Sequence, residues 1–122
     1  MSKKAEKAVL RRLKPAISIF GTETRTNFLL ALHAMEPTYV AEIARVINAS
    51  QENTKFTSEQ LIEAGIVTAR QMGRTKVLEF NNRFFAVNQL RALLAEIYLT
   101  DSELQRKVNQ VRKRPRRTGK EV

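Results

Sequence analysis

The side chains of this chain that could perform acid–base or metal chemistry are few and scattered. His33 is the single histidine and lies among apolar residues, so we interpret it as a structural histidine. Glu59 and Glu63 are four residues apart, a spacing typical of the solvated face of a helix. The absence of cysteine excludes a disulfide framework and a thiolate metal site. No nucleophile has a base and an orienting group nearby, and no glycine-rich loop could hold phosphates. We therefore predict that the protein is not an enzyme and has no cofactor.

A polar segment, residues 51–63, offers hydrogen-bonding chemistry instead. An amphipathic segment of residues 39–47 precedes it. One apolar stripe of helical spacing runs along that segment: Val40, Ile43, Ala44 and Ile47. Asn48 suits a left-handed turn, Ser50 can cap the following helix, and Gly65 can end it. A polar helix held against an apolar helix by a short turn has the shape that fits the major groove of DNA.

The inward positions of the polar segment are themselves polar. Counting back from Leu61 at helical spacing reaches Thr54 and either Thr57 or Ser58. The apolar candidates for core anchors are Leu61, Ile62 and Phe56. We interpret such a helix as loosely packed or as specialised to display hydrogen-bonding side chains.

Two apolar segments flank these elements and have helical spacing. Residues 16–35 form one helix or two short ones, because Gly21 and Thr22 weaken the middle. Proline at position 37 ends this segment, since the residue before a proline avoids the helical region. Residues 83–99 are predicted to form the second flanking helix.

Residues 66–80 alternate with a period of two, with Gly73 at the centre, and predict a β-hairpin. Residues 100–103, Thr-Asp-Ser-Glu, have the spacing of a capping box, so we expect a further helix to begin there. Its expected apolar side comprises Leu104, Val108 and Val111.

The net charge of +10 is concentrated at the two ends of the chain. Residues 1–14 carry six Lys and Arg against one acid, and residues 106–122 carry eight against one. We divide the chain into a basic N-terminal arm (1–14), one domain (15–99), and a C-terminal helix with a basic disordered tail (100–122). Basic arms suit a polyanion partner, although lysine-rich ends also serve solubility.

The first residues lack the apolar core of a signal peptide. The longest apolar run is far too short to span a bilayer, so no membrane partner is expected. We therefore expect a soluble, cytoplasmic protein.

Residues 16–99 resemble the winged-helix repressors of the ArsR and MarR type. Ser50-Gln51 through Glu63-Ala-Gly-Ile-Val67 is similar to their recognition helix, and Met72-Gly-Arg-Thr-Lys76 is similar to their wing. The resemblance implies a mainly helical winged helix-turn-helix fold with a small hairpin. This chain departs from the family at Thr54 and Ser58, where apolar residues are usual, and lacks the cysteine motif of the metal-sensing branch.

The resemblance implies a regulator, expected to be a repressor, that binds double-stranded DNA. The recognition helix would place polar side chains at base edges or phosphates. These candidates are Ser50, Gln51, Asn53, Thr54, Lys55, Thr57 and Ser58. The wing and the tail would bind the minor groove or the backbone. Their candidates are Arg70, Arg74, Thr75, Lys76, Arg112, Lys113 and Arg114. The alternative for the residues of the recognition helix is that they form a solvated helix face. The alternative for the basic residues of the wing is that their charge protects an edge strand.

In the resembling repressors the flanking helices form a dimer interface, so we expect a homodimer here. The residues expected in it are Ile17, Phe20, Leu90, Leu93, Leu94 and Ile97. The alternative is that the core of the monomer consumes both apolar stripes.

Two other functions stay open. A winged helix can serve as a protein-interaction module, which the nearly neutral middle of the chain favours modestly. A nonspecific nucleic-acid-binding protein could use its basic arms, although a single-strand binder would need a platform of exposed aromatics. Tyr39, Phe56 and Tyr98 are too scattered to indicate one.

Overall fold

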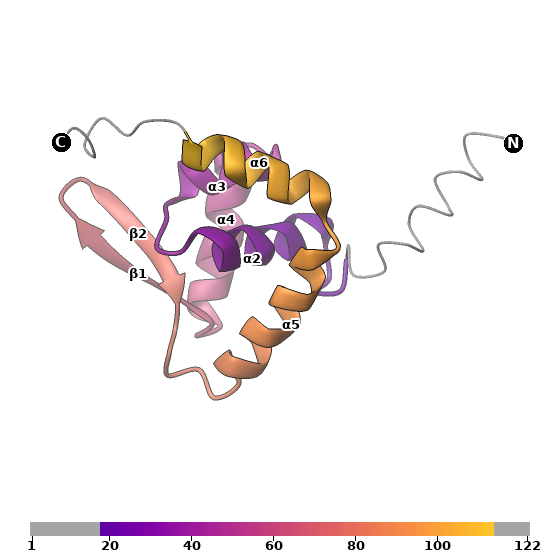
Figure 1. Cartoon of the computed structure of the whole chain (residues 1–122). Helices are drawn as coiled ribbons and strands as arrows, with labels where there is room; N and C mark the ends of the chain where they lie inside the picture. Colours follow the sequence, from indigo (N-terminus) through magenta and orange to yellow (C-terminus); the bar gives the residue numbers. More distant parts are fainter. Residues whose placement is uncertain (1–17, 114–122) are drawn as a thin grey trace, which may run out of the picture.

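A computed structural model describes residues 18–113, with the backbone alone at Lys113 (Figure 1). This part of the chain folds into five helices and one antiparallel two-stranded hairpin. The elements in chain order are α2 (Glu23–Met35), α3 (Val40–Ile47), α4 (Gln51–Glu63), β1 (Val67–Met72), β2 (Thr75–Phe80), α5 (Val87–Leu99) and α6 (Ser102–Lys113). The mainly helical fold class with a small hairpin, predicted from the sequence, is confirmed.

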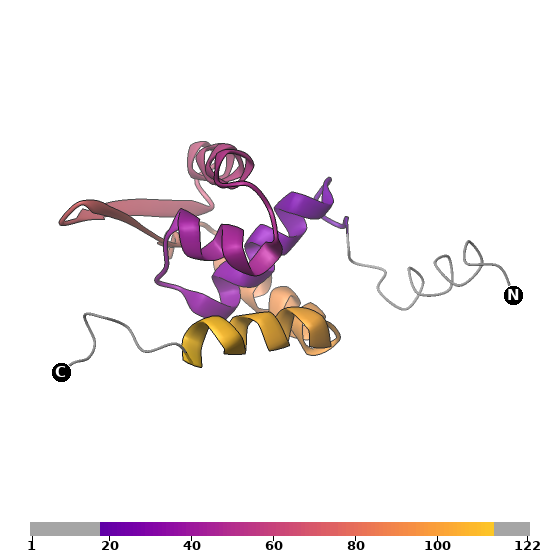
Figure 2. The same cartoon turned by 90° about the horizontal axis from the view of Figure 1, so that it is seen from above.

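Helix α2 forms the centre of the molecule. Figure 2 shows it between α4 on one side and α5 and α6 on the other, and it contacts all three helices. Six of its apolar side chains are at most 2% exposed: Phe28, Leu29, Leu30, Ala31, Leu32 and Met35. A helix that is apolar around its whole circumference must be covered on every side.

Helix α2 begins later than the apolar pattern from residue 16 suggested. Gly21 has a φ of 109°, and the Thr22 side chain accepts a hydrogen bond from the Arg25 amide at 3.0 Å. A left-handed glycine followed by a capping threonine starts a helix rather than continuing one. Residues 18–20 form a turn, and Ile17 lies outside the described residues.

The turn between α3 and α4 is built as the sequence predicts. Asn48 adopts the left-handed conformation (φ 57°, ψ 47°), and the Ala49 amide donates to the Ala44 carbonyl at 3.1 Å. Ser50 then caps α4, because its hydroxyl oxygen accepts from the Asn53 amide at 3.0 Å. This turn fixes the angle between the two helices.

Helix α4 ends in a Schellman motif around Gly65, whose φ is 80°. The Gly65 amide donates to Ile62 and the Ile66 amide donates to Leu61, each at 3.0 Å. The chain then enters the hairpin, where Val67 pairs with Phe80 and Met72 pairs with Thr75. A left-handed glycine at position 73 (φ 64°) makes the two-residue turn, as the alternating pattern predicts.

The last two helices start later than the sequence indicated. Helix α5 begins at Val87 rather than at Arg83, because the Asn81 side chain accepts from the Arg83 amide at 3.0 Å and holds a turn there. Asp101 caps α6, accepting from the Leu104 amide at 3.1 Å. The Thr100 hydroxyl instead donates to the Ile97 carbonyl at 2.7 Å. Thr100 therefore belongs to the end of α5 and is not the cap of α6.

Glu36, just after α2, joins the central helix to the hairpin and to α5. Its carboxylate accepts from the Phe80 amide at 3.1 Å and pairs with the Arg91 guanidinium. That guanidinium also lies over the Phe80 ring, 5.2 Å from its centroid. Thr38 and Leu78 exchange backbone hydrogen bonds beside this site. The base of the hairpin is thus fixed to α2.

We predict that Glu36→Ala lowers the free energy of unfolding by about 1–2 kcal/mol, measured by urea denaturation. The variant removes the acceptor of the Phe80 amide and one of the two acceptors of Arg91, which keeps its bond to Asn82, and the Glu36–Arg91 pair is only partly screened by solvent. The matched control is Glu103→Ala, which removes the surface ion pair between Glu103 and Lys107, 3.9 Å long. This variant should lower the free energy of unfolding by less than about 0.5 kcal/mol. Equal losses in the two variants would contradict this role of Glu36.

His33 lies in the contact between α2 and α5, with its ring edge-on to Tyr98 at 6.0 Å between centroids. Burial lowers the pKa of His33 from its ordinary value of 6.5, with nearby Glu36 opposing this shift and Arg91 adding to it. Burial, helped by Asp101, raises the pKa of the Tyr98 phenol. Both rings are therefore neutral at neutral pH.

Because the pKa of His33 is lowered on folding, the unfolded chain binds the extra proton first as the pH falls. We therefore predict that the contribution of His33 to stability is complete above pH 6.5 and is lost as the pH falls toward the lowered pKa. Urea denaturation at pH values from 7.5 to 5 should show that the free energy of unfolding falls more steeply with falling pH for the unmodified protein than for His33→Gln. Parallel losses would contradict the prediction.

Candidate nucleic-acid interface

The polar residues of α4 divide into an exposed group and a buried group. Gln51, Asn53 and Lys55 are exposed, and Ser50 is exposed while its hydroxyl caps the helix. Thr54, Thr57 and Ser58 are buried, as the helical spacing from Leu61 predicts, although all three were also candidates for DNA contact. Their side chains face the core of the free protein, so they are removed from the candidate base-contacting face.

Hydrogen bonds within α4 explain how polar residues occupy its inner face. The Thr54 hydroxyl donates to the Ser50 carbonyl at 2.8 Å, and the Ser58 hydroxyl donates to the Lys55 carbonyl at 2.7 Å. Each hydroxyl is satisfied by its own helix, so burial leaves no unpaired donor. Small side chains also let the backbone of α4 approach the core closely. Leu61, 4% exposed, is the main apolar anchor of this face.

The opposite, outward side of α4 carries residues that the sequence reading did not assign to the site. Phe56, expected as a possible core anchor, is 61% exposed, so that expectation is wrong. Glu52, Glu59 and Glu63 are exposed with it. Their spacing of three or four residues places all four side chains on one stripe. The sequence could have shown this, because Glu52, Phe56, Glu59 and Glu63 lie on the side of the helix opposite the inward residues Thr54 and Leu61.

A cleft of about 360 Å³ separates α4 from the hairpin and the start of α3. Three basic residues from different segments line it: Lys55 of α4, Arg74 of the hairpin turn and Lys76 of β2. Thr75 lines it as well, and Glu59 is the single acidic residue in its lining. The fold thus brings together Lys55 and the predicted residues at the tip of the hairpin. The apolar floor includes Ile62 and Leu78.

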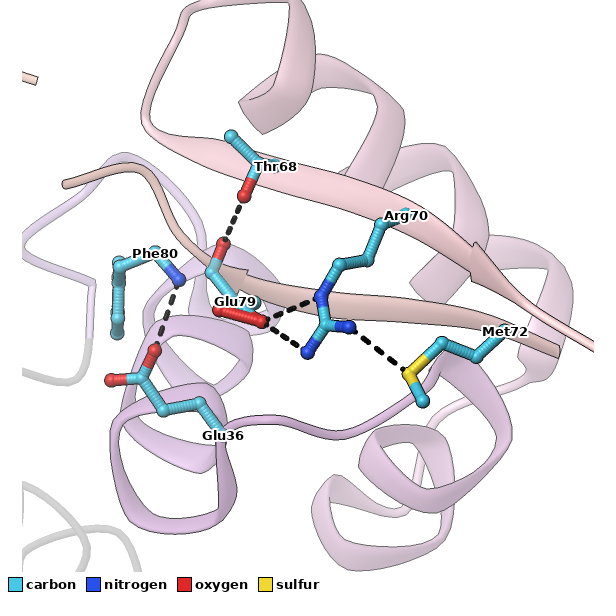
Figure 3. A network of polar contacts seen from close by, with 6 residues as sticks. All are labelled: Glu36, Thr68, Arg70, Met72, Glu79 and Phe80. Atoms are coloured by element: carbon cyan, nitrogen blue, oxygen red, sulfur yellow. Dashed lines mark hydrogen bonds and ion pairs between the residues drawn. The ribbon is translucent and has the colours of Figure 1, made fainter. Parts of the chain in front are cut away.

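Arg70 lies apart from this cleft. Its guanidinium pairs with Glu79 on the neighbouring strand at 2.9 Å, as Figure 3 shows. The same side chain contacts the sulfur of Met72, and Thr68 contacts the Glu79 carbonyl (Figure 3). In the structure Arg70 is therefore engaged in a cross-strand ion pair, and its contact with DNA stays a prediction.

Arg112 is part of the folded domain and not of a free tail, contrary to the expectation from the sequence. It belongs to α6, and its guanidinium donates to the Met35 carbonyl at the end of α2. A cation is favourable there because the carbonyls at the end of a helix carry partial negative charge. The side chain of Lys113 and all of Arg114 lie outside the described residues.

The residues expected in a dimer interface also divide into two groups. Leu94 is fully buried in the core of one chain, so its assignment to an interface is wrong. Phe20, Leu90 and Ile97 are half-buried, and Leu93 is 41% exposed. Three further apolar residues are exposed on or near the ends of α5 and α2: Phe85, Leu99 and Ile19.

Within residues 18–113, no group of histidine and acidic side chains could hold a metal ion. The helices of this range are all too short or too polar to cross a membrane.

The fold is that of a winged helix. The chain is similar to the crystal structure of a MarR-family transcriptional regulator from Rhodococcus sp. RHA1, with a TM-score of 0.55 and 19% sequence identity. The similarity covers 89% of this chain and 82% of that chain. No protein-family model matches the sequence, and no curated protein matches it. The likeness shows that the helices and hairpin have the winged-helix arrangement, with α3 and α4 as the helix-turn-helix and β1–β2 as the wing.

Proposed function

We propose that the protein is a transcriptional regulator that binds double-stranded DNA through α4 and the wing. The observation that carries the proposal is the shared cleft, which Lys55 of the recognition helix lines together with Arg74 and Lys76 of the wing. A recognition helix in the major groove and a wing at the minor groove have one phosphate backbone between them. A cleft with three cations between those two elements fits that backbone.

The start of α4 has the properties of the end that enters the groove. Gln51 and Asn53 are exposed in its first turn, and both side chains can make paired hydrogen bonds to adenine. The first backbone amides of a helix also carry partial positive charge, which favours a nearby phosphate. The later turns carry Glu59 and Glu63, whose carboxylates would be repelled by the phosphates if these turns lay along the DNA backbone. We therefore propose entry by the first turns.

Selection of binding sites from random duplexes tests this proposal. We expect enrichment of one duplex motif, and we expect single strands to compete poorly for the protein, because a rigid helix and wing require the geometry of a duplex. A failure to enrich any duplex at moderate salt would overturn the proposal. Repression is supported only by the resemblance of residues 16–99 to repressors, and a reporter assay with the selected site would test it.

We predict that the double variant Arg74→Ala and Lys76→Ala flattens the plot of log affinity against log salt concentration. The slope should fall by roughly 0.9 for each phosphate contact that is lost, with similar losses on the selected site and on random duplexes. The single variant Arg83→Ala also removes an exposed cation, from the turn before α5, and should leave the slope unchanged. A wing variant that changes the preferred motif would show that these residues read bases.

We further propose that the regulator is a homodimer that uses the exposed apolar residues of α5. Leu93 is 41% exposed on this helix and Leu99 is 73% exposed at its end, so the monomer leaves apolar surface of α5 uncovered. A two-fold dimer would place two copies of α4 about one turn of DNA apart, ~34 Å. The selected motif should then contain two half-sites at that spacing.

We predict that Leu93→Asp converts the dimer to a folded monomer, measured by sedimentation and circular dichroism at micromolar concentration. Leu94→Asp should unfold the chain instead, because this side chain is fully buried and a charge there has no partner. Sedimentation of the unmodified protein as a monomer would contradict the dimer.

The second candidate function is a protein-interaction module. The stripe of Glu52, Phe56, Glu59 and Glu63 favours it, because an exposed aromatic ring among carboxylates can anchor a basic partner. This candidate predicts that no duplex is enriched and that the protein shows little DNA binding at physiological salt.

A further inference from the structure

The outward side of α4 carries an aromatic ring and a carboxylate next to each other. Phe56 is 61% exposed, and Glu52 is exposed one helical turn before it. Residues four apart on a helix are neighbours, so the Glu52 carboxylate and the Phe56 ring form one small surface. The core does not need either residue, because α4 is anchored through Leu61 and through the bond from Arg25 to Gln60 at 3.0 Å.

Both groups have counterparts on the edges of bases in the major groove. A phenyl ring can contact the C5-methyl group of thymine, and a carboxylate can accept a hydrogen bond from the N4 amino group of cytosine. Lys55 is the one cation of α4, and it lines the cleft beside the wing. The outward stripe therefore lacks the arginine that most often reads guanine.

We infer that Phe56 and Glu52 determine the DNA specificity of this protein, with Phe56 contacting a thymine methyl group and Glu52 accepting from a cytosine amino group. The inference rests on the proposed function. It names the sequence class of the duplex, which is a half-site that contains a thymine and a cytosine in adjacent or nearly adjacent base pairs. Neither residue was assigned a DNA contact on the basis of the sequence.

The carboxylates also act against the wrong duplexes. Where Glu52 meets a base edge without a donor, its charge loses water and gains no hydrogen bond, which penalises binding. Glu59 and Glu63 extend the negative stripe along the rest of α4 and repel phosphates. The helix therefore gains affinity from matched bases more than from charge, while the cations of the cleft hold the backbone.

The experiment replaces thymines of the selected duplex with deoxyuridine, one position at a time, and measures affinity for the full-length protein. Deoxyuridine lacks only the C5-methyl group. At one position in each half-site we expect about fourfold weaker binding, the factor that burial of one methyl group gives. Phe56→Ala should bind the thymine and deoxyuridine duplexes equally, whereas Phe56→Leu should keep part of the difference. Circular dichroism checks that both variants fold.

The second half of the experiment tests Glu52. Replacement of the cytosine by another base, with its partner changed to match, should weaken binding of the unmodified protein by about tenfold or more. Glu52→Ala should remove this preference while it keeps the thymine effect. Insensitivity of the unmodified protein to every deoxyuridine, or a Phe56→Ala variant that stays sensitive to it, would overturn the assignment of Phe56. A Glu52→Ala variant that keeps the cytosine preference would overturn that of Glu52.

These outcomes are separable from failure of the proposed function. If selection enriches no duplex, DNA binding by α4 and the wing is itself overturned, and the inference falls with it. If a motif is enriched but has no methyl-sensitive thymine, DNA binding stands and only the inference is wrong. The thymine comparison on the unmodified protein needs no variant, so it gives an answer even where a substitution prevents folding.

Discussion

The burial of α2 on all of its sides is the constraint on which the rest of the structure depends. The consecutive apolar residues 28–32 of α2 lie on all sides of the helix and are all buried, so several other elements must cover them. Helices α3 and α4, helices α5 and α6 and strand β2 each contact it. The helix-turn-helix and the wing are therefore positioned by one shared core and not by contacts with each other alone. Fixing the end of α2 through Glu36 extends this control to the base of the wing.

The inner face of α4 shows how a small domain can place a helix close to its core with few large side chains. The hydroxyls of Thr54 and Ser58 donate hydrogen bonds to backbone carbonyls of the preceding turn, so burial leaves neither hydroxyl without a partner. The apolar attachment of α4 is then modest and centres on Leu61. Its outward residues are left exposed, and the Arg25 side chain donates a hydrogen bond to Gln60 of α4 at 3.0 Å.

The charges of the described residues are arranged by segment. Three cations line the cleft between α4 and the wing, and Glu59 lies both in this lining and on the outward stripe of carboxylates of α4. In our proposal the cleft supplies affinity for the backbone and the stripe supplies discrimination among bases. Arg70 and Arg112 show that basic residues can be consumed by the fold itself, one by a cross-strand pair and the other by a helix end. A count of cations therefore overstates the surface available to a polyanion.

The sequence by itself determined the order of the elements and the places where helices and strands turn. Asn48, Ser50, Gly65 and Gly73 act through local conformation and hydrogen bonds to near neighbours, so their roles can be read without knowledge of the fold. Helix starts were less certain, because Asn81 and Asp101 compete locally with the apolar period. This local competition displaced the predicted starts of α5 and α6.

Only the tertiary structure decided which polar and apolar residues are available to a partner. Phe56 is exposed although it was a candidate core anchor, because burial depends on the side of α4 that faces α2 and α3, and a nearly all-polar helix gives a weak periodic signal. Thr54 is buried at the inward position that the spacing from Leu61 predicts. Leu94 was assigned to the core and Arg112 to the end of α2 by contacts between residues far apart in sequence. The cleft that joins Lys55 to Arg74 and Lys76 likewise exists only after the wing folds back beside α4.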